Sequence, residues 1–168
     1  MIAYRQATQA DAPAVLSLLE EIMTHHGAAS PGRERLSSVV SGIIAASDHC
    51  FLVAEASGAG DASGRSGAAA PAGRIVGMCA LVFSVSTWSA APVCELQDVI
   101  VTQDYRREEV GQRLLAVAEE IARARGCSRL FLLAESLNLG AHSFYRNLGL
   151  QEKTCLYFER DFTETAAD

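Results

Sequence analysis

Two carboxylates and a glycine stand close together in the segment from Glu95 to Leu115. Glu95 and Asp98 lie in an apolar stretch typical of a strand, and Gly111 comes early in an amphipathic stretch typical of a helix. A carboxylate can accept a proton from a group bound beside it. The first turn of a helix offers unpaired N–H groups and a positive dipole end to an anion, and Gly111 would let that anion come close to the backbone. The segment predicts an anion site next to a proton acceptor.

A second group of chemically useful side chains lies between Asn138 and Gly149. Asn138 precedes a short amphipathic stretch that carries Tyr145, and Gly149 follows it. A tyrosine hydroxyl can donate a hydrogen bond to a departing anion. The alternative is that Phe144 and Tyr145 complete an apolar helix face, because buried aromatic side chains usually serve packing.

Together the two segments resemble the GNAT superfamily of N-acetyltransferases. Arg106 and Gly111 match the ends of the family's acetyl-coenzyme A loop, and Glu109 stands where the first glycine of that loop belongs. The later segment resembles the family's fourth helix through Asn138-x-x-Ala141-x-x-Phe144-Tyr145-x-x-Leu148-Gly149. With the opening Arg5-x-Ala7-Thr8-x-x-Asp11, the resemblance covers nearly the whole chain outside residues 57–73.

The resemblance implies that acetyl-coenzyme A is the co-substrate. Its pyrophosphate would lie on the loop before the helix, its pantetheine arm along the preceding strand and beside Asn138, and its sulfur near Tyr145. The coenzyme-binding residues implied in this way are Val99, Ile100, Val101, Arg106, Arg107, Glu109, Val110, Gly111, Gln112, Asn138 and Tyr145. No His, Cys or Asp spacing typical of a metal site is present, so no metal is expected.

The implied activity is transfer of an acetyl group to a primary amine, expected to belong to a small molecule, by direct attack in a ternary complex. Alternatives are a protein N-terminal or lysine acetyltransferase and a non-catalytic acyl-coenzyme A-binding module. Tyr145 is the candidate acid. Glu95 is the favoured base, acting through a water molecule, and Asp98 is the other candidate. Strand alternation places Glu95 and Gln97 on one face and Asp98 on the other.

Four further side chains are candidates for binding the acceptor. Gln97 would orient it, and Trp88 would cover a cation by a cation–π contact or serve loop packing. His25 and His26 end the first helix, where a histidine also interacts favourably with the helix dipole.

Composition excludes several other classes of function. The net charge is −6 and no stripe of Lys or Arg is present, so nucleic acid is not an expected partner. The longest apolar run is far shorter than a membrane span, and the first residues lack a secretory signal. Five cysteines without paired spacing suggest free thiols packed in a reducing cytoplasm. Dimers are common among GNAT relatives, so the resemblance also makes a homodimer an expectation.

Hydrophobic periodicity predicts one α/β (α+β) domain spanning residues 1–168. Like the GNAT fold, it would have a mixed, mostly antiparallel sheet of about six or seven strands and about four helices. The expected strands are Tyr4–Ala7, Cys50–Ala56, Arg74–Ser84, Val93–Val101, Arg129–Ala134 and Cys155–Asp161. The expected helices end at Gly27, near Ser47, at Ala124 and at Asn147. Residues 57–73 are expected to form a flexible low-complexity loop, and residues 163–168 a frayed tail.

Overall fold

A computed structural model describes residues 1–57, 73–160 and 162 of the chain. Most of the predicted 57–73 loop and the predicted 163–168 tail lie outside the described residues. The chain divides into two compact units, Met1–Leu133 and Ala134–Asp168, which are described separately below. The expectation of a single domain therefore stays a prediction.

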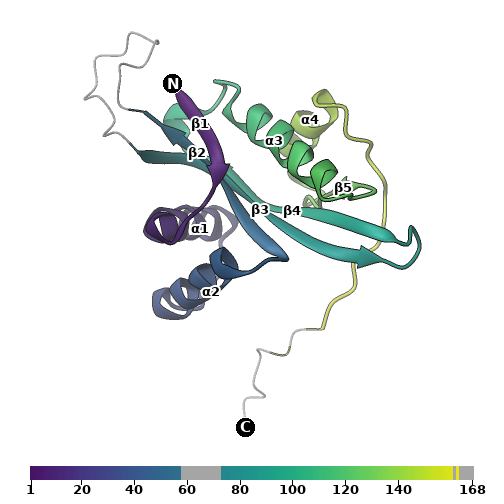
Figure 1. The fold of residues 1–168 in the computed structure, drawn as a ribbon, viewed down its shortest axis with the longest axis horizontal. Helices are drawn as coiled ribbons and strands as arrows, with labels where there is room; N and C mark the ends of the chain where they lie inside the picture. Colours follow the sequence, from purple (N-terminus) through teal and green to yellow (C-terminus); the bar gives the residue numbers. More distant parts are fainter. Residues whose placement is uncertain (58–72, 161, 163–168) are drawn as a thin grey trace. The chain divides into compact units, whose positions relative to one another are not determined.

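The first unit is built on a mixed sheet whose five strands lie in the order β1-β2-β3-β4-β5 (Figure 1). The strands are β1 (Ile2–Gln6), β2 (His49–Ala56), β3 (Arg74–Ser86), β4 (Ala91–Val101) and β5 (Leu130–Phe131). The pairs β1–β2, β2–β3 and β3–β4 are antiparallel, and β5 is parallel to β4. The predicted mixed, mostly antiparallel sheet is confirmed, with fewer strands than expected.

Helices cover both faces of this sheet (Figure 1). On one face lie α1 (Ala12–His26) and α2 (Arg33–Ala45), and on the other lies α3 (Val110–Ala124). The second unit contains α4 (Leu139–Asn147). Single 3₁₀ turns precede α1, at η1 (Gln9–Asp11), and follow β4, at η2 (Gln103–Tyr105). None of the described helices has the length and apolar character to span a membrane.

Strand alternation divides the core between the two helical layers. On the α1–α2 face, Phe51, Met78 and Ile100 pack in one cluster with the helix residues Val15, Leu16, Leu18, Leu19, Leu36 and Val40. Gly77 faces the other layer, where a Cβ atom at this position would lie 3.3 Å from Leu114 Cδ1 and 3.0 Å from the Ile100 carbonyl oxygen. A glycine is therefore needed where α3 and β4 approach β3 most closely. Of the five free thiols, Cys50, Cys79 and Cys94 are buried as expected, whereas Cys127 is partly exposed and Cys155 is exposed.

The first helical segment is held by a charged cluster at its start. The Arg5 guanidinium donates to both carboxylate oxygens of Asp11, at 2.7 and 2.9 Å, and to Glu55 at 2.7 Å. The Thr8 N–H also donates to Asp11, at 2.7 Å. These bonds join β1 to β2 and to the start of the helical layer, while Gly27 (φ 65°) ends α1 as predicted.

Two strand predictions are wrong. The expected strand Arg129–Ala134 is reduced to Leu130–Phe131, and Leu133, inside the expected range, is 60% exposed. The expected strand Cys155–Asp161 is absent from its described residues, and residues 151–160 are exposed throughout. Apolar composition alone does not make a strand, because its backbone also needs a hydrogen-bonded neighbour.

Candidate functional site

The candidate site lies where β4 leads into α3, and its first component is an extra residue in β4. Met78 of β3 pairs with Ile100 and Ala80 pairs with Gln97, so Asp98 and Val99 together stand opposite the single residue Cys79. This is a β-bulge, which bends a strand and interrupts its pairing. Asp98 takes the left-handed conformation (φ 51°) that allows the extra residue to fit.

The bulge adjoins a stretch of β4 that has no strand beside it. Among the described residues, β5 pairs with β4 only at Cys94 and Glu95. The segment Leu96–Val101, called here the open edge, therefore has backbone N–H and C=O groups without a strand partner on the β5 side. Such groups can bind an extended ligand with amide groups in the way that a further strand would.

Asp98 is the carboxylate at the bulge. Asp98 is an exposed residue, but neighbouring protein atoms partly desolvate its carboxylate and raise the pKa of Asp98 above its ordinary value. Desolvation is the cause, and no charged group in the described part of the chain adds to the shift. A carboxylate of raised pKa binds a proton more strongly than a solvated one.

Glu95 and Gln97 occupy the other face of β4, toward α1 and α2. They stand opposite Val82 and Ala80 of β3, and Ala80 belongs to the core cluster on that side. Both side chains therefore share one face, as alternation predicts. The bulge changes the alternation at Asp98, so that Ile100 returns to the α1–α2 face.

The turn between β4 and α3 contains two further left-handed residues. Arg107 has φ 69°, and Glu109, the residue that caps α3, has φ 62°. The first backbone hydrogen bond of α3 runs from Arg113 N to the Glu109 carbonyl oxygen at 2.9 Å. The N–H groups of Val110, Gly111 and Gln112 precede that bond, so they are the groups that the helix itself leaves for an anion.

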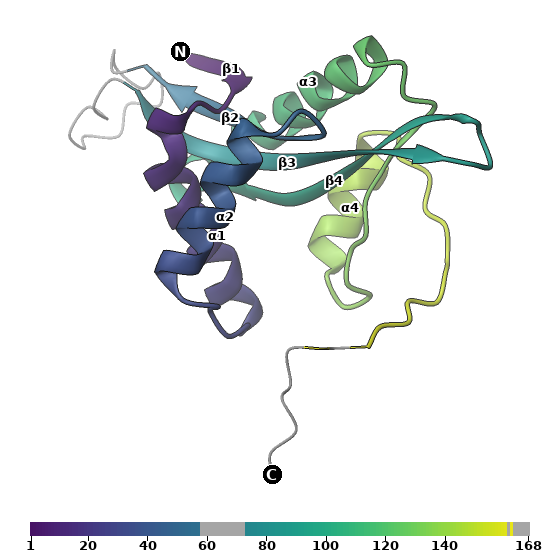
Figure 2. The ribbon, with the colours of Figure 1, turned by 60° about the horizontal axis from the view of Figure 1, so that its bottom comes forward.

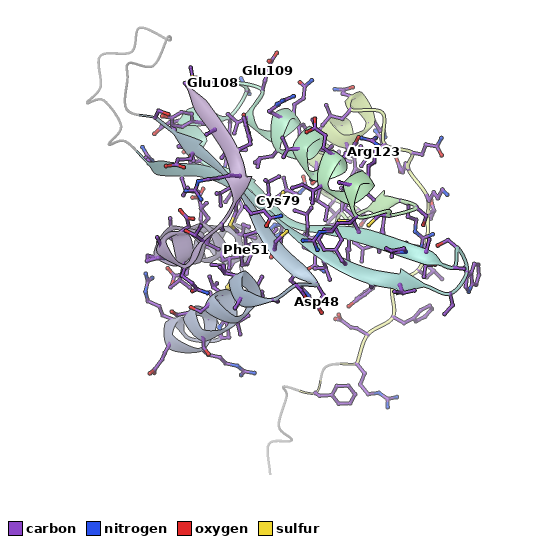
Figure 3. All side chains as sticks on the ribbon, viewed as in Figure 1. Asp48, Phe51, Cys79, Glu108, Glu109 and Arg123 are labelled. Carbon is purple, nitrogen blue, oxygen red and sulfur yellow. The ribbon has the colours of Figure 1, made fainter. Side chains whose placement is uncertain are left out.

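The charges around this turn are mixed. Figure 3 shows Glu108 and Glu109 where the turn enters α3. The guanidinium group of Arg106 already has two partners. Its Nε donates to the Val101 carbonyl oxygen at 2.9 Å, and its Nη2 lies 3.5 Å from a carboxylate oxygen of Glu21. Arg106 thus ties the turn to the end of β4 and to α1.

Two residues near this turn were given no role in the site by the sequence analysis. Glu21 of α1 pairs with Arg106 across 85 positions of chain. Tyr4 of β1 has a pKa raised by burial, with the charges of Arg113 and Glu109 acting on it in opposite directions. No local pattern signals these neighbours, since each comes from a distant segment.

The remaining candidates for binding the acceptor, His25, His26 and Trp88, lie in two separate places. His25 lies one helical turn after Glu21 on the same side of α1, and its ring packs edge-on against His26 at 5.4 Å. Trp88 lies in the turn between β3 and β4, at the far end of β4 from the bulge, and is 99% exposed. Seven residues of extended strand, about 23 Å, separate Asp98 from the start of β4 at Ala91, so Trp88 and Asp98 do not lie together.

Asn138 and Tyr145 belong to the second unit. The Asn138 side chain accepts a hydrogen bond from Ala141 N at 3.1 Å and so caps α4. Tyr145 is partly exposed, with its ring 5.2 Å from that of Phe144 in an edge-on arrangement. Among the described residues, no group of three or more His, Cys, Asp or Glu side chains could hold a metal ion.

Comparison with known proteins gives a consistent result. The model of the acetyltransferase (GNAT) family matches residues 19–150. The chain is 33% identical over 91 residues to a thialysine N-epsilon-acetyltransferase of Bos taurus, covering 51% of this chain and 53% of that protein. It is 33% identical over 82 residues to a glucosamine 6-phosphate N-acetyltransferase of Trypanosoma brucei brucei, covering 48% and 54%. The chain spans about half the length of the curated relatives it matches.

Solved structures share the fold. A glucosamine-6-phosphate N-acetyltransferase from Arabidopsis thaliana matches with a TM-score of 0.70 at 16% identity, covering 96% of this chain and 99% of that one. AAC(6')-Iy, in complex with a bisubstrate analog of coenzyme A, matches with a TM-score of 0.73 at 15% identity, covering 96% and 98%. At these identities the likeness concerns the fold alone.

Proposed function

This chain belongs to the acetyltransferase (GNAT) family, and on that premise we propose that it transfers the acetyl group of acetyl-coenzyme A to a primary amine of a small molecule. The observation that carries the proposal is the bulged, open edge of β4 leading into the first turn of α3. The open edge of β4 can pair with the amide groups of a ligand, and the start of α3, which follows it in the chain, can bind a diphosphate. A ligand that carries amide groups next to a diphosphate would therefore find both sites in the right order.

The residues present fit such a ligand. The N–H groups of Val110, Gly111 and Gln112 would hold the diphosphate, with Arg107 supplying positive charge. The open edge, at Val99, Ile100 and Val101, would pair with the amide arm, and Asn138 would contact the same arm. When bound, acetyl-coenzyme A supplies an activated thioester carbonyl, and backbone N–H groups of the open edge would stabilise negative charge that develops on it.

Asp98 is our choice for the proton acceptor. An amine with a pKa near 10 must lose a proton before it can attack. Desolvation raises the pKa of Asp98, and the residue lies on the bulge beside the open edge. Glu95, favoured from the sequence, is the alternative: it lies on the α1–α2 side together with Gln97, so an acceptor that Gln97 orients would reach Glu95 rather than Asp98.

Tyr145 would serve the departing thiolate. An unperturbed tyrosine has a pKa of about 10 and a simple thiol one of about 8.5, so full proton transfer is mildly uphill in water. A hydrogen bond from the hydroxyl to the thiolate is therefore the role we assign to Tyr145. Tyr145→Phe should lower turnover while coenzyme binding is retained.

A small-molecule acceptor is supported by the relatives. The names of the two reported relatives specify thialysine and glucosamine 6-phosphate, which are both small amines. An acceptor would find polar contacts on one side of α1, at Glu21 and His25. The ion pair of Arg106 with Glu21 lies on the same side.

A second candidate function is a module that binds acyl-coenzyme A without catalysis. The observation that favours it is the pair of carboxylates, Glu108 and Glu109, at the end of the turn that must hold a diphosphate. Binding without turnover on any amine or peptide would support it and would contradict the enzyme proposal.

The test is release of free thiol from acetyl-coenzyme A across a panel of amines: amino acids, amino sugars, aminophosphonates, diamines and peptides. We expect turnover with at least one small amine. Asp98→Asn should lower that turnover by about 100-fold and remove the acidic limb of the pH–rate profile. Asp48→Asn, the same change at an exposed aspartate between α2 and β2, should do neither.

The pH dependence has a definite sign. The base must be ionised, so activity falls as the pH drops through its pKa. Because the pKa of Asp98 is raised, the limb should lie above the ordinary aspartate value of about 4. If Glu95→Gln removes the limb and Asp98→Asn leaves it, Glu95 is the base; if neither does, both assignments fail.

A further inference from the structure

The second half of α1 contributes little to the core. The buried residues of this helix all lie before position 20: Val15, Leu16, Leu18 and Leu19. Residues 20–26 are each partly buried or exposed. A segment that buries few apolar side chains opens at a low cost in free energy, so polar contacts have a large influence on how well this end of the helix is ordered.

Two adjacent glutamates in this half of α1 have different partners. Glu20 pairs with Arg33 at the start of α2, the helix that lies beside α1 (Figure 2). Glu21 lies 3.5 Å from Nη2 of Arg106, which belongs to the turn between β4 and α3. The same end of α1 is therefore joined to its neighbouring helix by one carboxylate and to the proposed anion-binding turn by the next.

Arg106 also holds a backbone group of the open edge. The Thr102 N–H donates to the Val76 carbonyl oxygen of β3 at 2.9 Å. Successive residues of a paired strand direct their backbone groups to opposite sides, so the carbonyl of Val101 points away from β3, toward the open edge. This carbonyl oxygen accepts the hydrogen bond from Arg106 Nε at 2.9 Å.

One guanidinium group thus links three elements: the end of β4, the turn and α1. Its donors form a rigid planar fork, so the two partners are held in a fixed relation to each other. A diphosphate on the N–H groups of Val110, Gly111 and Gln112 would hold the backbone of the turn and, with it, the base of the Arg106 side chain. When one ligand orders a segment, a connected segment becomes less costly to order.

We propose that Arg106 is a positioning residue, which transmits binding of the coenzyme at the turn to Glu21 and so orders residues 20–26 of α1. This inference rests on the proposed function, which assigns the diphosphate to the turn and the acceptor to Glu21 and His25. It gives Arg106 a different role from that of a diphosphate ligand. Since a carboxylate has two oxygens, Glu21 can accept from Arg106 and from an ammonium group together.

The exposure of the ion pair sets the expected strength of this coupling. The side chains of Arg106 and Glu21 are 53% and 44% exposed, so solvent screens their attraction. We therefore expect an effect of about fivefold, at the lower end of the range for coupling between two sites.

The test is amide hydrogen exchange of the full chain with and without saturating coenzyme A, which requires no amine. In the wild type, coenzyme A should slow exchange about fivefold in residues 20–26, in addition to slowing it in residues 110–112. Glu21→Gln should abolish the slowing in residues 20–26 and retain it in residues 110–112.

Glu20→Gln is the matched control. It makes the same change at the adjacent position and removes the pair with Arg33, but it leaves the contact between Arg106 and Glu21 in place. Slowing of exchange in residues 20–26 should therefore persist in Glu20→Gln. Circular dichroism checks that all variants are folded.

Arg106→Lys separates positioning from coenzyme binding. Lysine keeps the positive charge at the turn but has a single ammonium group in place of the fork. This variant should lose the slowing in residues 20–26, while calorimetry should find the dissociation constant of coenzyme A within about twofold of the wild-type value. A rise of tenfold or more would make Arg106 a diphosphate ligand and would contradict the proposal.

The remaining outcomes distinguish this inference from the proposed function. If coenzyme A slows exchange in residues 110–112 but not in residues 20–26 of the wild type, the coupling is wrong and the proposed function stands. Equal losses in Glu20→Gln and Glu21→Gln would likewise refute the coupling, because they would reflect a general loosening of α1. If neither segment responds, coenzyme A does not bind at the turn, and the proposed function fails together with the inference.

Discussion

Three residues at the candidate site adopt backbone angles that side chains with a Cβ atom rarely take. Asp98, Arg107 and Glu109 all have φ between 51° and 69°. The left-handed conformation costs roughly 1–2 kcal/mol for a residue other than glycine. Strain of this kind often accumulates at functional sites, where surrounding structure enforces it, and here it shapes both the bulge and the start of α3.

Glycine at position 109 should therefore improve the site. In Glu109→Gly we expect tighter binding of coenzyme A by about fivefold, because a negative charge is removed beside the helix end. Stability should rise by up to about 1 kcal/mol, because relief of strain exceeds the added entropy of the unfolded chain. Calorimetry and urea unfolding measure the two effects.

Glu108→Gly is the matched control. Glu108 is not among the residues of positive φ, so its replacement removes the same charge without relieving strain, and stability should fall. Equal changes in stability for the two variants would contradict this account of the turn.

Thr102 offers a second test at the same scale. Its hydroxyl is buried at the end of β4 and has no hydrogen-bond partner among the described residues. An unpaired buried hydroxyl costs about 1–3 kcal/mol, so the nearly isosteric Thr102→Val should raise the midpoint of urea unfolding. Thr102→Ser keeps the hydroxyl and should not stabilise; a gain in Thr102→Ser as well would refute the explanation.

At the level of elements, the ion cluster of Arg5, Asp11 and Glu55 holds the helical layer to the sheet edge. Hydrogen bonds from Arg5 keep the pKa of Asp11 well below its usual range. Asp11 is buried whereas Arg5 is about one-third exposed, so solvent weakens the pair to some extent. Asp11→Asn should destabilise the chain by about 2 kcal/mol in urea unfolding.

The same cluster predicts how stability depends on pH. A carboxyl whose pKa is lowered by folding contributes stability above its unfolded pKa of about 4, and that contribution is lost as the pH falls below this value. The difference in stability between the wild type and Asp11→Asn should therefore shrink from pH 5 downward, near and below an unfolded pKa of about 4. A constant difference over this range would contradict the assigned role.

Elements with strong local signals were predicted well. The end of α3 at Ala124 agrees with the sequence because the apolar periodicity of the helix is regular, and the side chains at this period are buried: Val110, Leu114, Leu115 and Ala118. The end of α1 at Gly27 has a purely local cause, the need for positive φ. In α2, by contrast, the apolar periodicity is a weaker guide, because Val39 next to the buried Val40 is 49% exposed.

Features that depend on distant neighbours were not predictable. The bulge at Asp98 exists only in the pairing with β3, and the Arg106–Glu21 contact joins segments far apart in the chain. The shortness of β5 and the absence of a strand in residues 155–160 likewise depend on which backbone partners are in reach. For the site, the sequence therefore predicted the residues of the turn but not its strained geometry.

At the scale of the whole chain, the two units differ in how much they bury. The central strands contain fully buried residues such as Leu52, Met78 and Leu81, whereas α4 has none. Opening of a segment costs less where fewer apolar contacts are lost. Amide exchange should therefore be slow in β2 and β3 and faster by orders of magnitude in α4.

Ligand should change this pattern selectively. Adding coenzyme A should slow exchange in α4 and around Val110–Gln112 if Asn138 and the α3 turn both contact it. Exchange at β1, which the proposal leaves free of ligand, should be unaffected. Uniform slowing, or slow exchange in α4 before any addition, would contradict the expectation.

The extra residue at Asp98 also reverses, partway along β4, which side chains face which layer of helices. Before it, odd-numbered residues such as Gln97 face α1 and α2; after it, the even-numbered Ile100 does. In a sequence alignment this appears as a reversal of the odd–even rule halfway along one strand. Loss of the single codon for Asp98 would restore unbroken alternation: Val99 alone would then stand opposite Cys79 on the α3 side, and Ile100 would keep its place toward α1 and α2. This reversal can therefore be recognised from the sequence alone, and it indicates chains in which β4 carries a bulge beside the open edge.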